Sequence, residues 1–203
     1  MRLNLFNCLL DGFPDEFEGY QLNTDYRVGI LITLLLEDDD IPDDIKMLQA
    51  FNLLYKDKVP DDLDVARHGV IWFLSCGKSE ICYADGYVED KCTEKCIDFN
   101  QDHLDIWGAF WARGIDLNSV NMHWFKFMSA LGNLGDCPLT NKMGYRATDL
   151  KDMKGETRKY YAELKDKYKV RKIVSTEEME KIIADAEEKH GSYYAKLFRA
   201  QQQ

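Results

Sequence analysis

Two short segments that join a proline to acidic residues constrain the fold most strongly. They are IPDD at residues 41–44 and VPDD at residues 59–62. A proline fits the first turn of an α-helix, and acidic side chains in that turn interact favourably with the positive end of the helix dipole. Apolar residues at helical spacing follow each segment, namely Ile45, Leu48, Phe51 and Leu54, and then Leu63, Ala66, Val70, Phe73 and Leu74. The sequence therefore predicts two consecutive amphipathic helices.

Three further helices are predicted within residues 1–147. The apolar run at residues 28–36 follows Asn23, Thr24 and Asp25, whose side chains can accept hydrogen bonds from a helix start, so a helix is expected over 25–37. Two later apolar stripes are Phe99, Leu104, Trp107, Phe110 and Trp111, and then Val120, Trp124, Phe127, Met128 and Leu131. They predict a fourth helix, ended near Gly114, and a fifth.

The N-terminal segment and the C-terminal quarter complete the predicted architecture. Short apolar stretches broken by DGFPDEFEG favour a small N-terminal β-hairpin. Residues 1–147 contain 13 basic and 25 acidic residues, whereas residues 148–203 contain 13 basic and 11 acidic residues. We therefore expect a mainly α fold, with a compact multi-helix core domain at residues 1–147, a loop at about 75–97, and a charged helical C-terminal extension at 148–203.

The extension carries a thin stripe of apolar and tyrosine side chains between its charges. Its members are Met153, Thr157, Tyr160, Tyr161, Leu164 and Tyr168. Such a stripe is typical of an exposed helix or of a helix that awaits a partner. The segment STEE at 175–178 has the pattern of a capping box and predicts one more helix start.

Net charge and apolar run length exclude two classes of partner. The formal net charge of −10 argues against nucleic acid, because binding to phosphates depends on an excess of Lys and Arg. A membrane partner is not expected either, because no run of 18 apolar residues occurs. The start of the chain is weak as a signal peptide, so we expect a cytoplasmic protein.

The cysteines do not have the spacing of a typical zinc site. Four of the six, Cys76, Cys82, Cys92 and Cys96, lie in the predicted loop, with gaps of the form C-x5-C, C-x9-C and C-x3-C. A structural zinc site usually uses two close pairs such as C-x2-C. Reduced thiols in a cytosolic loop are favoured over a zinc site, and no role is assigned to these four residues.

One cluster of side chains could support enzymatic chemistry. The chain has no G-x-S-x-G nucleophile elbow and no glycine-rich phosphate loop. Asp98, Asp102 and Asp105, with His123 on the next helix, could hold a divalent metal in a hydrolase of phosphate esters. The favoured interpretation is that Asp98 and its neighbours cap the fourth helix and line its solvent side. Catalytic residues, metal sites and cofactors are therefore not predicted.

His123 raises a similar choice between chemistry and packing. It directly precedes Trp124, and adjacent residues on a helix point about 100° apart. If Trp124 faces the core, His123 lies at the border of the core, where its ring can pack while a nitrogen bonds to the backbone or a carboxylate. This border role is favoured over a ligand or a general base.

Several motifs together resemble the bacteriophage gp-fifteen family, whose members are encoded in the tail-morphogenesis region of phages and prophages of Gram-positive bacteria. The matching stretches are LNTDYRVGILITLLLEDDDIPDD, DFNQDHLDIWGAFWARGIDL, MHWFKFMSALGNL and GYRATDLKDMKGETRKYYAELKDKY, within residues 20–170. In this resemblance a Tyr–Arg pair starts the last helix. The residues that carry it are Asn23, Thr24, Asp25, Arg27, Asp98, Phe99, Gly114, Ile115, Asp116, Leu117, His123, Trp124, Phe127, Tyr145 and Arg146.

The resemblance implies a function in phage tail assembly without catalysis. Proteins encoded between the major tail protein and the tape-measure protein commonly act as tail assembly chaperones, so this chain would bind the tape-measure protein or other tail proteins in the cytoplasm of the bacterial host cell. Self-association is also expected. The candidate partner contacts are Met153, Tyr160, Tyr161, Leu164 and Tyr168. The alternatives are a structural component of the finished tail or connector, and the metal-dependent hydrolase described above.

Overall fold

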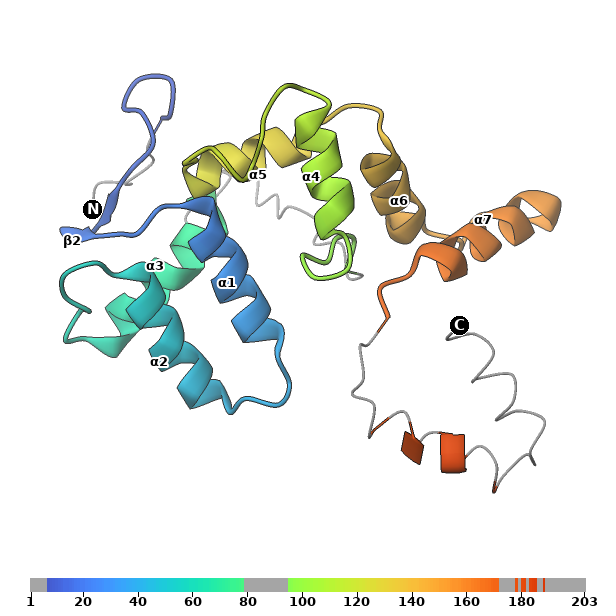
Figure 1. Cartoon of the computed structure of the whole chain (residues 1–203), viewed down its shortest axis with the longest axis horizontal. Coiled ribbons are helices and arrows are strands. Elements are labelled where there is room, and N and C mark those ends of the chain that lie inside the picture. Colours follow the sequence, from blue (N-terminus) through green and yellow to red (C-terminus); the bar gives the residue numbers. More distant parts are fainter. Residues whose placement is uncertain are drawn as a thin grey trace. The chain divides into compact units, whose positions relative to one another are not determined.

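A computed structural model describes residues 7–78 and 95–171, together with residues 178, 180, 181, 183–185 and 188. The chain divides into two compact units, Met1–Lys169 and Val170–Gln203. The elements of the first unit are β1 (Glu16–Phe17), β2 (Tyr20–Gln21), α1 (Tyr26–Glu37), α2 (Asp43–Leu54), α3 (Leu63–Leu74), α4 (His103–Trp111), α5 (Trp124–Gly132), α6 (Pro138–Ala147) and α7 (Gly155–Tyr168) (Figure 1). Strands β1 and β2 form an antiparallel hairpin. The prediction of a mainly helical fold with a small N-terminal hairpin is confirmed.

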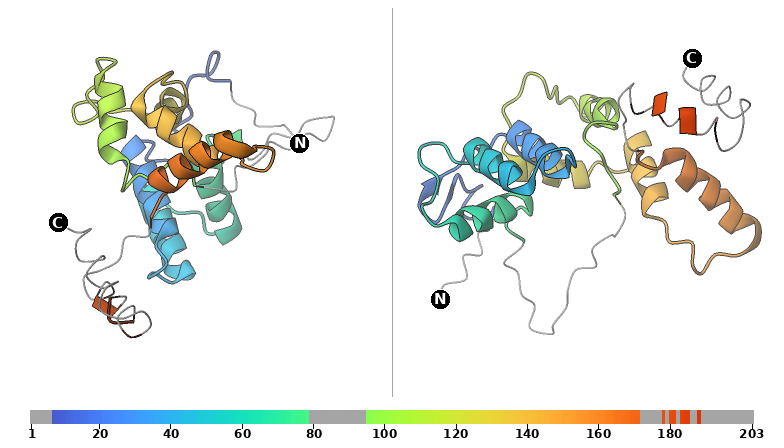
Figure 2. Two further views of the ribbon diagram at one scale, coloured as in Figure 1. Left: turned by 90° about the vertical axis from the view of Figure 1, so that its right-hand side faces the viewer. Right: turned by 90° about the horizontal axis from the view of Figure 1, so that it is seen from below.

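Helices α1, α2 and α3 pack against one another, as both sets of views show (Figures 1 and 2). Asp25 caps α1 by accepting a hydrogen bond of 2.9 Å from the backbone N–H of Arg27. Pro42 immediately precedes α2, as the Pro–acid pattern predicts. Lys46 of α2 donates from Nζ to the carbonyl of Leu36 at 3.3 Å, which satisfies a group that the end of α1 would leave unpaired.

Helix α5 supplies the aromatic centre of the core. Phe127 stacks on Tyr26 of α1 and on Phe110 of α4, with ring centroids 4.8 and 5.3 Å apart. Trp124 is also buried and packs directly against α1 at Gly29. A Cβ atom at Gly29 would overlap the Trp124 ring, so the close approach of α1 and α5 depends on this glycine.

The second half of the first unit differs from the sequence prediction in four respects. Helix α5 begins at Trp124, so Val120 of the predicted stripe lies before it. Helix α4 begins at His103, because Phe99 lies in a preceding turn in which Asp98 accepts hydrogen bonds from the backbone N–H groups of Asn100 and Gln101, both at 2.8 Å. Helix α6 was not predicted from apolar spacing. Tyr145 and Arg146 lie at the end of α6, not at the start of the next helix.

The packing boundary lies after Lys169, whereas the sequence suggested a boundary after residue 147. The reason is that α7 packs on α6. Tyr168 stacks on Tyr145 with ring centroids 5.6 Å apart, and Lys165 donates to the carbonyl of Thr148 at 2.8 Å. Helix α7 therefore belongs to the first unit.

Two other features can be stated only for part of the chain. Within the described ranges, no helix is both long enough and apolar enough to cross a membrane. Most of the loop expected at about 75–97, with Cys82 and Cys92, and most of the STEE segment lie outside those ranges. Cys76 and Cys96 are half-buried.

Candidate partner-binding site

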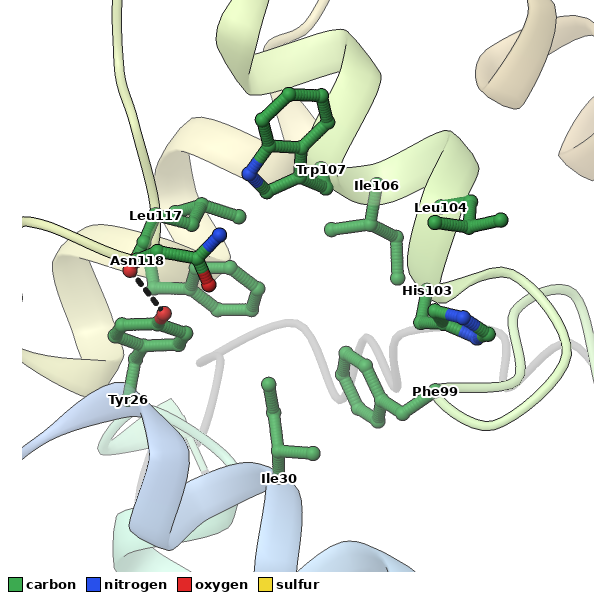
Figure 3. Close-up of a pocket in the computed structure, with 10 residues that line it drawn as sticks. Tyr26, Ile30, Phe99, His103, Leu104, Ile106, Trp107, Leu117 and Asn118 are labelled. Carbon is green, nitrogen blue, oxygen red and sulfur yellow. Dashed lines mark hydrogen bonds between the residues drawn. The ribbon is translucent and has the colours of Figure 1, made fainter.

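An open apolar pocket of about 500 Å³ lies between α1, α4, α5 and the segment that joins α4 to α5. Figure 3 shows its side chains converging from these elements. The lining residues are Tyr26, Ile30, Phe99, His103, Leu104, Ile106, Trp107, Leu117, Asn118 and Phe127. Pockets of this size commonly accept apolar groups, with a few polar atoms that fix orientation.

Residues at the start of α1 hold one wall of the pocket in place. The hydroxyl of Tyr26 donates to the carbonyl of Leu117 at 2.7 Å, the bond drawn in Figure 3. Arg27 donates from Nη2 to the same carbonyl at 2.8 Å and to the carbonyl of Val120 at 3.2 Å. The Arg27 guanidinium is also paired with Asp25 at 3.2 Å. These bonds fix the α4–α5 connection against α1.

The segment GIDL, residues 114–117, contributes to the same wall of the pocket. Gly114 has a φ of +77°, a left-handed conformation that suits glycine, and it turns the chain after α4. Asp116 then accepts hydrogen bonds from the Ser119 hydroxyl at 2.5 Å and the Asn118 backbone N–H at 3.0 Å, and these bonds lower its pKa. Leu117 is buried and contributes an apolar surface to the pocket.

The segments 23–25 and 123–124 lie beside this wall and are joined by backbone hydrogen bonds. Trp124 donates its backbone N–H to the carbonyl of Thr24 at 2.7 Å, and Asp25 forms an isolated antiparallel bridge with His123. Asn23 donates its backbone N–H to the carbonyl of Leu54 at 2.7 Å. Of the three polar residues expected to cap the first helix, Asp25 provides the side-chain cap.

His123 caps helix α5 and does not lie in its middle. Its Nδ1 accepts a hydrogen bond of 3.0 Å from the backbone N–H of Phe125, so its Nε2 is the nitrogen that donates to the carbonyl of Pro14 at 2.9 Å. The ring stacks on Phe13 with centroids 5.2 Å apart. Burial lowers the pKa of His123, although the Pro14 bond and Asp15 act in the opposite direction. The neutral ring therefore links the N-terminal segment to the start of α5.

Asp102 lies in a buried ion-pair network and not on the solvent side of the fourth helix. Its side chain is 1% exposed, and Arg146 of α6 donates to both of its oxygens, at 2.6 and 3.0 Å. Lys142 bonds to Asp102 at 3.2 Å and also to Asp105. Burial alone would raise the pKa of Asp102, but the bonds from Arg146, from the Asp98 N–H and from Lys142 outweigh it, so the pKa is lowered.

The three aspartates of the proposed metal site, Asp98, Asp102 and Asp105, are each paired with Lys or Arg side chains of the protein. Asp98 pairs with Lys95 at 2.7 Å, and Lys95 also pairs with Glu37 at 2.7 Å. His123 is engaged by Pro14 and Phe125, as described above. Among residues 7–78 and 95–171, and the few described beyond them, no group of three or more His, Cys, Asp or Glu side chains is placed to hold a metal ion. The geometry gives no support to the hydrolase alternative.

The predicted contact stripe is only partly available for a partner. Tyr160 is 57% exposed and makes an edge-on contact with Tyr161 at a centroid distance of 5.4 Å. Met153, Tyr161, Leu164 and Tyr168 are half-buried. The stripe thus serves partly to dock α7 on α6, where Arg146 also donates from Nε to the carbonyl of Tyr168.

Sequence reasoning missed two features of the site. The pairing of Asp102 with Lys142 and Arg146 joins residues about 40 positions apart, and a sequence pattern offers no local signal for it. The outward direction of Leu104 and Trp111 was also not anticipated, although their seven-residue separation places them on one face of a helix.

Comparison with known proteins identifies the family. No curated protein and no solved structure matches the chain. The family model described as Bacteriophage Gp15 protein matches residues 9–170, which include the hairpin and α1 to α7. The match covers most of the chain and includes all the motifs of the pocket wall and the ion-pair network. The chain therefore belongs to the Bacteriophage Gp15 protein family.

Proposed function

We propose that this protein is a non-enzymatic tail assembly chaperone that binds the tape-measure protein of its phage. Membership of a phage protein family supports the phage context. The observation that carries the proposal is the contrast between the charged and the apolar side chains. Asp102 and Asp105, at the start of α4, are paired with Arg146 and Lys142 of α6. In contrast, Leu104 and Trp111 on α4 and Tyr160 on α7 face solvent. Exposed apolar surface of this kind is typical of a protein-binding role.

Tyr160, Tyr161 and the rest of the α7 stripe form the first proposed contact with the partner. Tyr160 is 57% exposed, so its ring is available to a partner while α7 stays packed on α6. The basic residues of α7, Lys165 and Lys167 among them, alternate with acids, which favours a partner helix with charges of both signs. Binding in the cytoplasm of the host cell would keep the long tape-measure helix soluble before the tail tube assembles.

Co-expression with the tape-measure protein of the same phage tests this function. The full chain should co-purify with the tape-measure protein and raise its soluble fraction. Tyr160→Ser should weaken the complex without changing thermal unfolding. Leu63→Ser is a matched control, because Leu63 is also 57% exposed but lies on α3.

The two possible failures have different meanings. If the soluble fraction of the tape-measure protein is the same with and without this chain, the chaperone function is wrong. If Tyr160→Ser and Leu63→Ser bind equally well, the function stands and the α7 contact is wrong.

A further inference from the structure

Helix α4 extends the apolar surface of the pocket outward. Leu104 is 71% exposed and Trp111 is 55% exposed, and Leu104 also forms part of the pocket rim. Trp107 lines the pocket and stacks on Trp111, with centroids 5.1 Å apart and an interplanar angle of 15°. These three residues lie on one helix face, at spacings of three and four. The pocket together with Leu104, Trp107 and Trp111 is named the α4 docking surface.

The shape and lining of this surface favour apolar side chains on a helix. The pocket is open to one side and has about 500 Å³, enough for one or two large side chains but not for a whole folded segment. None of its ten lining residues is Lys, Arg, Asp or Glu. An amphipathic helix that inserts side chains one turn apart is the recognition mode that fits an apolar pocket beside an exposed apolar stripe.

The charges beside the pocket residue Tyr26 are those of Arg27, Asp25 and Asp116, which leaves a net negative charge that favours a basic partner. Asp116 directly precedes the lining residues Leu117 and Asn118, and its negatively charged carboxylate accepts hydrogen bonds from Ser119 and Asn118. Residues 1–147, which contain every pocket residue, carry 25 acidic and 13 basic residues. Basic residues at the edges of a bound helix would therefore complement this part of the protein, whereas acidic ones would be repelled.

We propose that the α4 docking surface binds a basic amphipathic helix, with one or two large apolar side chains in the pocket and Lys or Arg residues at its edges. The source of the helix, a segment of the tape-measure protein, rests on the proposed function. The chemistry of recognition does not depend on that source, because it follows from the pocket, the exposed face of α4 and the surrounding charge.

A pair of synthetic helical peptides tests the proposal on the full chain. Both are 18 residues long, with the same leucine stripe, but one has lysines and the other glutamates on its polar face. Calorimetry should show binding of the Leu/Lys peptide and none of the Leu/Glu peptide. Leu104→Glu should weaken Leu/Lys binding about tenfold or more, because the apolar contact of one large side chain is lost.

Leu48→Glu is the matched control. Leu48 is 52% exposed on α2, away from the pocket lining, and its substitution adds the same negative charge. General attraction between a basic peptide and an acidic protein would make both variants bind slightly more tightly, so only docking at α4 predicts weakening by Leu104→Glu alone. Circular dichroism during heating confirms that both variants are folded.

Three results would overturn the proposal. Equal Leu/Lys affinity for the wild type and Leu104→Glu would show that the peptide binds elsewhere. Equal binding of both peptides would show that charge has no role. Concentration-dependent dimers in sedimentation that Leu104→Glu abolishes, without peptide binding by the wild type, would assign the surface to a second copy of this chain. None of these results bears on the co-purification with the tape-measure protein, so the two proposals fail separately.

Discussion

At the scale of single residues, Asp102 and Arg146 form a buried ion pair that joins the start of α4 to α6. Both side chains are almost fully buried, at 1% and 5% exposure, and Arg146 approaches both carboxylate oxygens. A pair of this kind adds little net stability compared with an apolar pair, but removing one partner leaves the other charge buried and uncompensated. Its main effect is to specify how α4 and α6 meet.

Asp102→Asn should therefore destabilise the protein strongly. The substitution leaves the Arg146 guanidinium buried without a carboxylate, and we expect the free energy of unfolding to fall by about 3–5 kcal/mol. Urea unfolding followed by circular dichroism measures the change. Asp61→Asn is the control, since Asp61 pairs with Lys58 on the surface and its loss should have no measurable effect. Similar unfolding midpoints for the two variants would contradict the role given to Asp102.

The residues of the candidate site were recognisable in the sequence to different degrees. Asp25 was correctly predicted as a cap because its partner is two positions away. Asp98 was predicted to cap the fourth helix, but it accepts its hydrogen bonds from Asn100 and Gln101 in the turn before that helix. The side chains of Tyr26 and Leu117 form the same pocket although they are 91 positions apart. A contact at that separation depends on the whole fold and leaves no local pattern.

At the scale of secondary-structure elements, α1 to α3 were predictable because their start signals are local. Helix α6, in contrast, was not predictable from its apolar residues. Its sequence, PLTNKMGYRA, contains few apolar residues, and the two side chains that it buries are Leu139 and Arg146. An arginine does not contribute to an apolar stripe, so a helix that is held by an ion pair escapes a search for apolar periodicity. Its start still has a local signal, because Pro138 occupies the first helical position.

The packing of α1 on α5 gives a prediction at this scale. Gly29→Ala should force α1 away from the Trp124 ring and lower the free energy of unfolding by about 1–3 kcal/mol, the usual cost of overpacking a core. Gly108→Ala in α4 is the matched control, because the new methyl group meets open space and alanine favours a helix, so stability should rise by up to about 1 kcal/mol. Differential scanning calorimetry of both variants gives the comparison, and a stabilising effect of Gly29→Ala would refute the close contact.

At the scale of the whole molecule, the question is where the first unit ends. A change in charge at residue 147 suggested a division there, while the contacts of α7 with α6 suggest one after Lys169. These describe different properties, because surface charge can change within a packed unit. The charged helical extension at 148–203 therefore remains a proposal about how the chain is divided, based on its charge.

Two truncated chains test whether the packed unit ends near residue 147 or near residue 169. A chain that ends at Lys169 should unfold cooperatively, with the same midpoint for the first unit as the full chain. A chain that ends at Ala147 loses the Tyr145–Tyr168 stack and the bond from Arg146 to the Tyr168 carbonyl, so its midpoint should be lower. Thermal unfolding by circular dichroism measures both. If the chain that ends at Ala147 unfolds at the same midpoint or a higher one, α7 is not part of the first unit.

The contact between Thr24 and Trp124 also has a consequence for synthesis on the ribosome. Helix α1 holds the most apolar run of the sequence, and α2 and α3 cover part of it, but Trp124 is made about 100 residues after Thr24. At a translation rate of about 5–20 residues per second, this interval is roughly 5–20 seconds. For that time the nascent chain exposes the face of α1 that α5 later covers. Cellular chaperones that bind apolar segments therefore have a defined period in which to act on this protein. This period ends when α5 emerges from the ribosome.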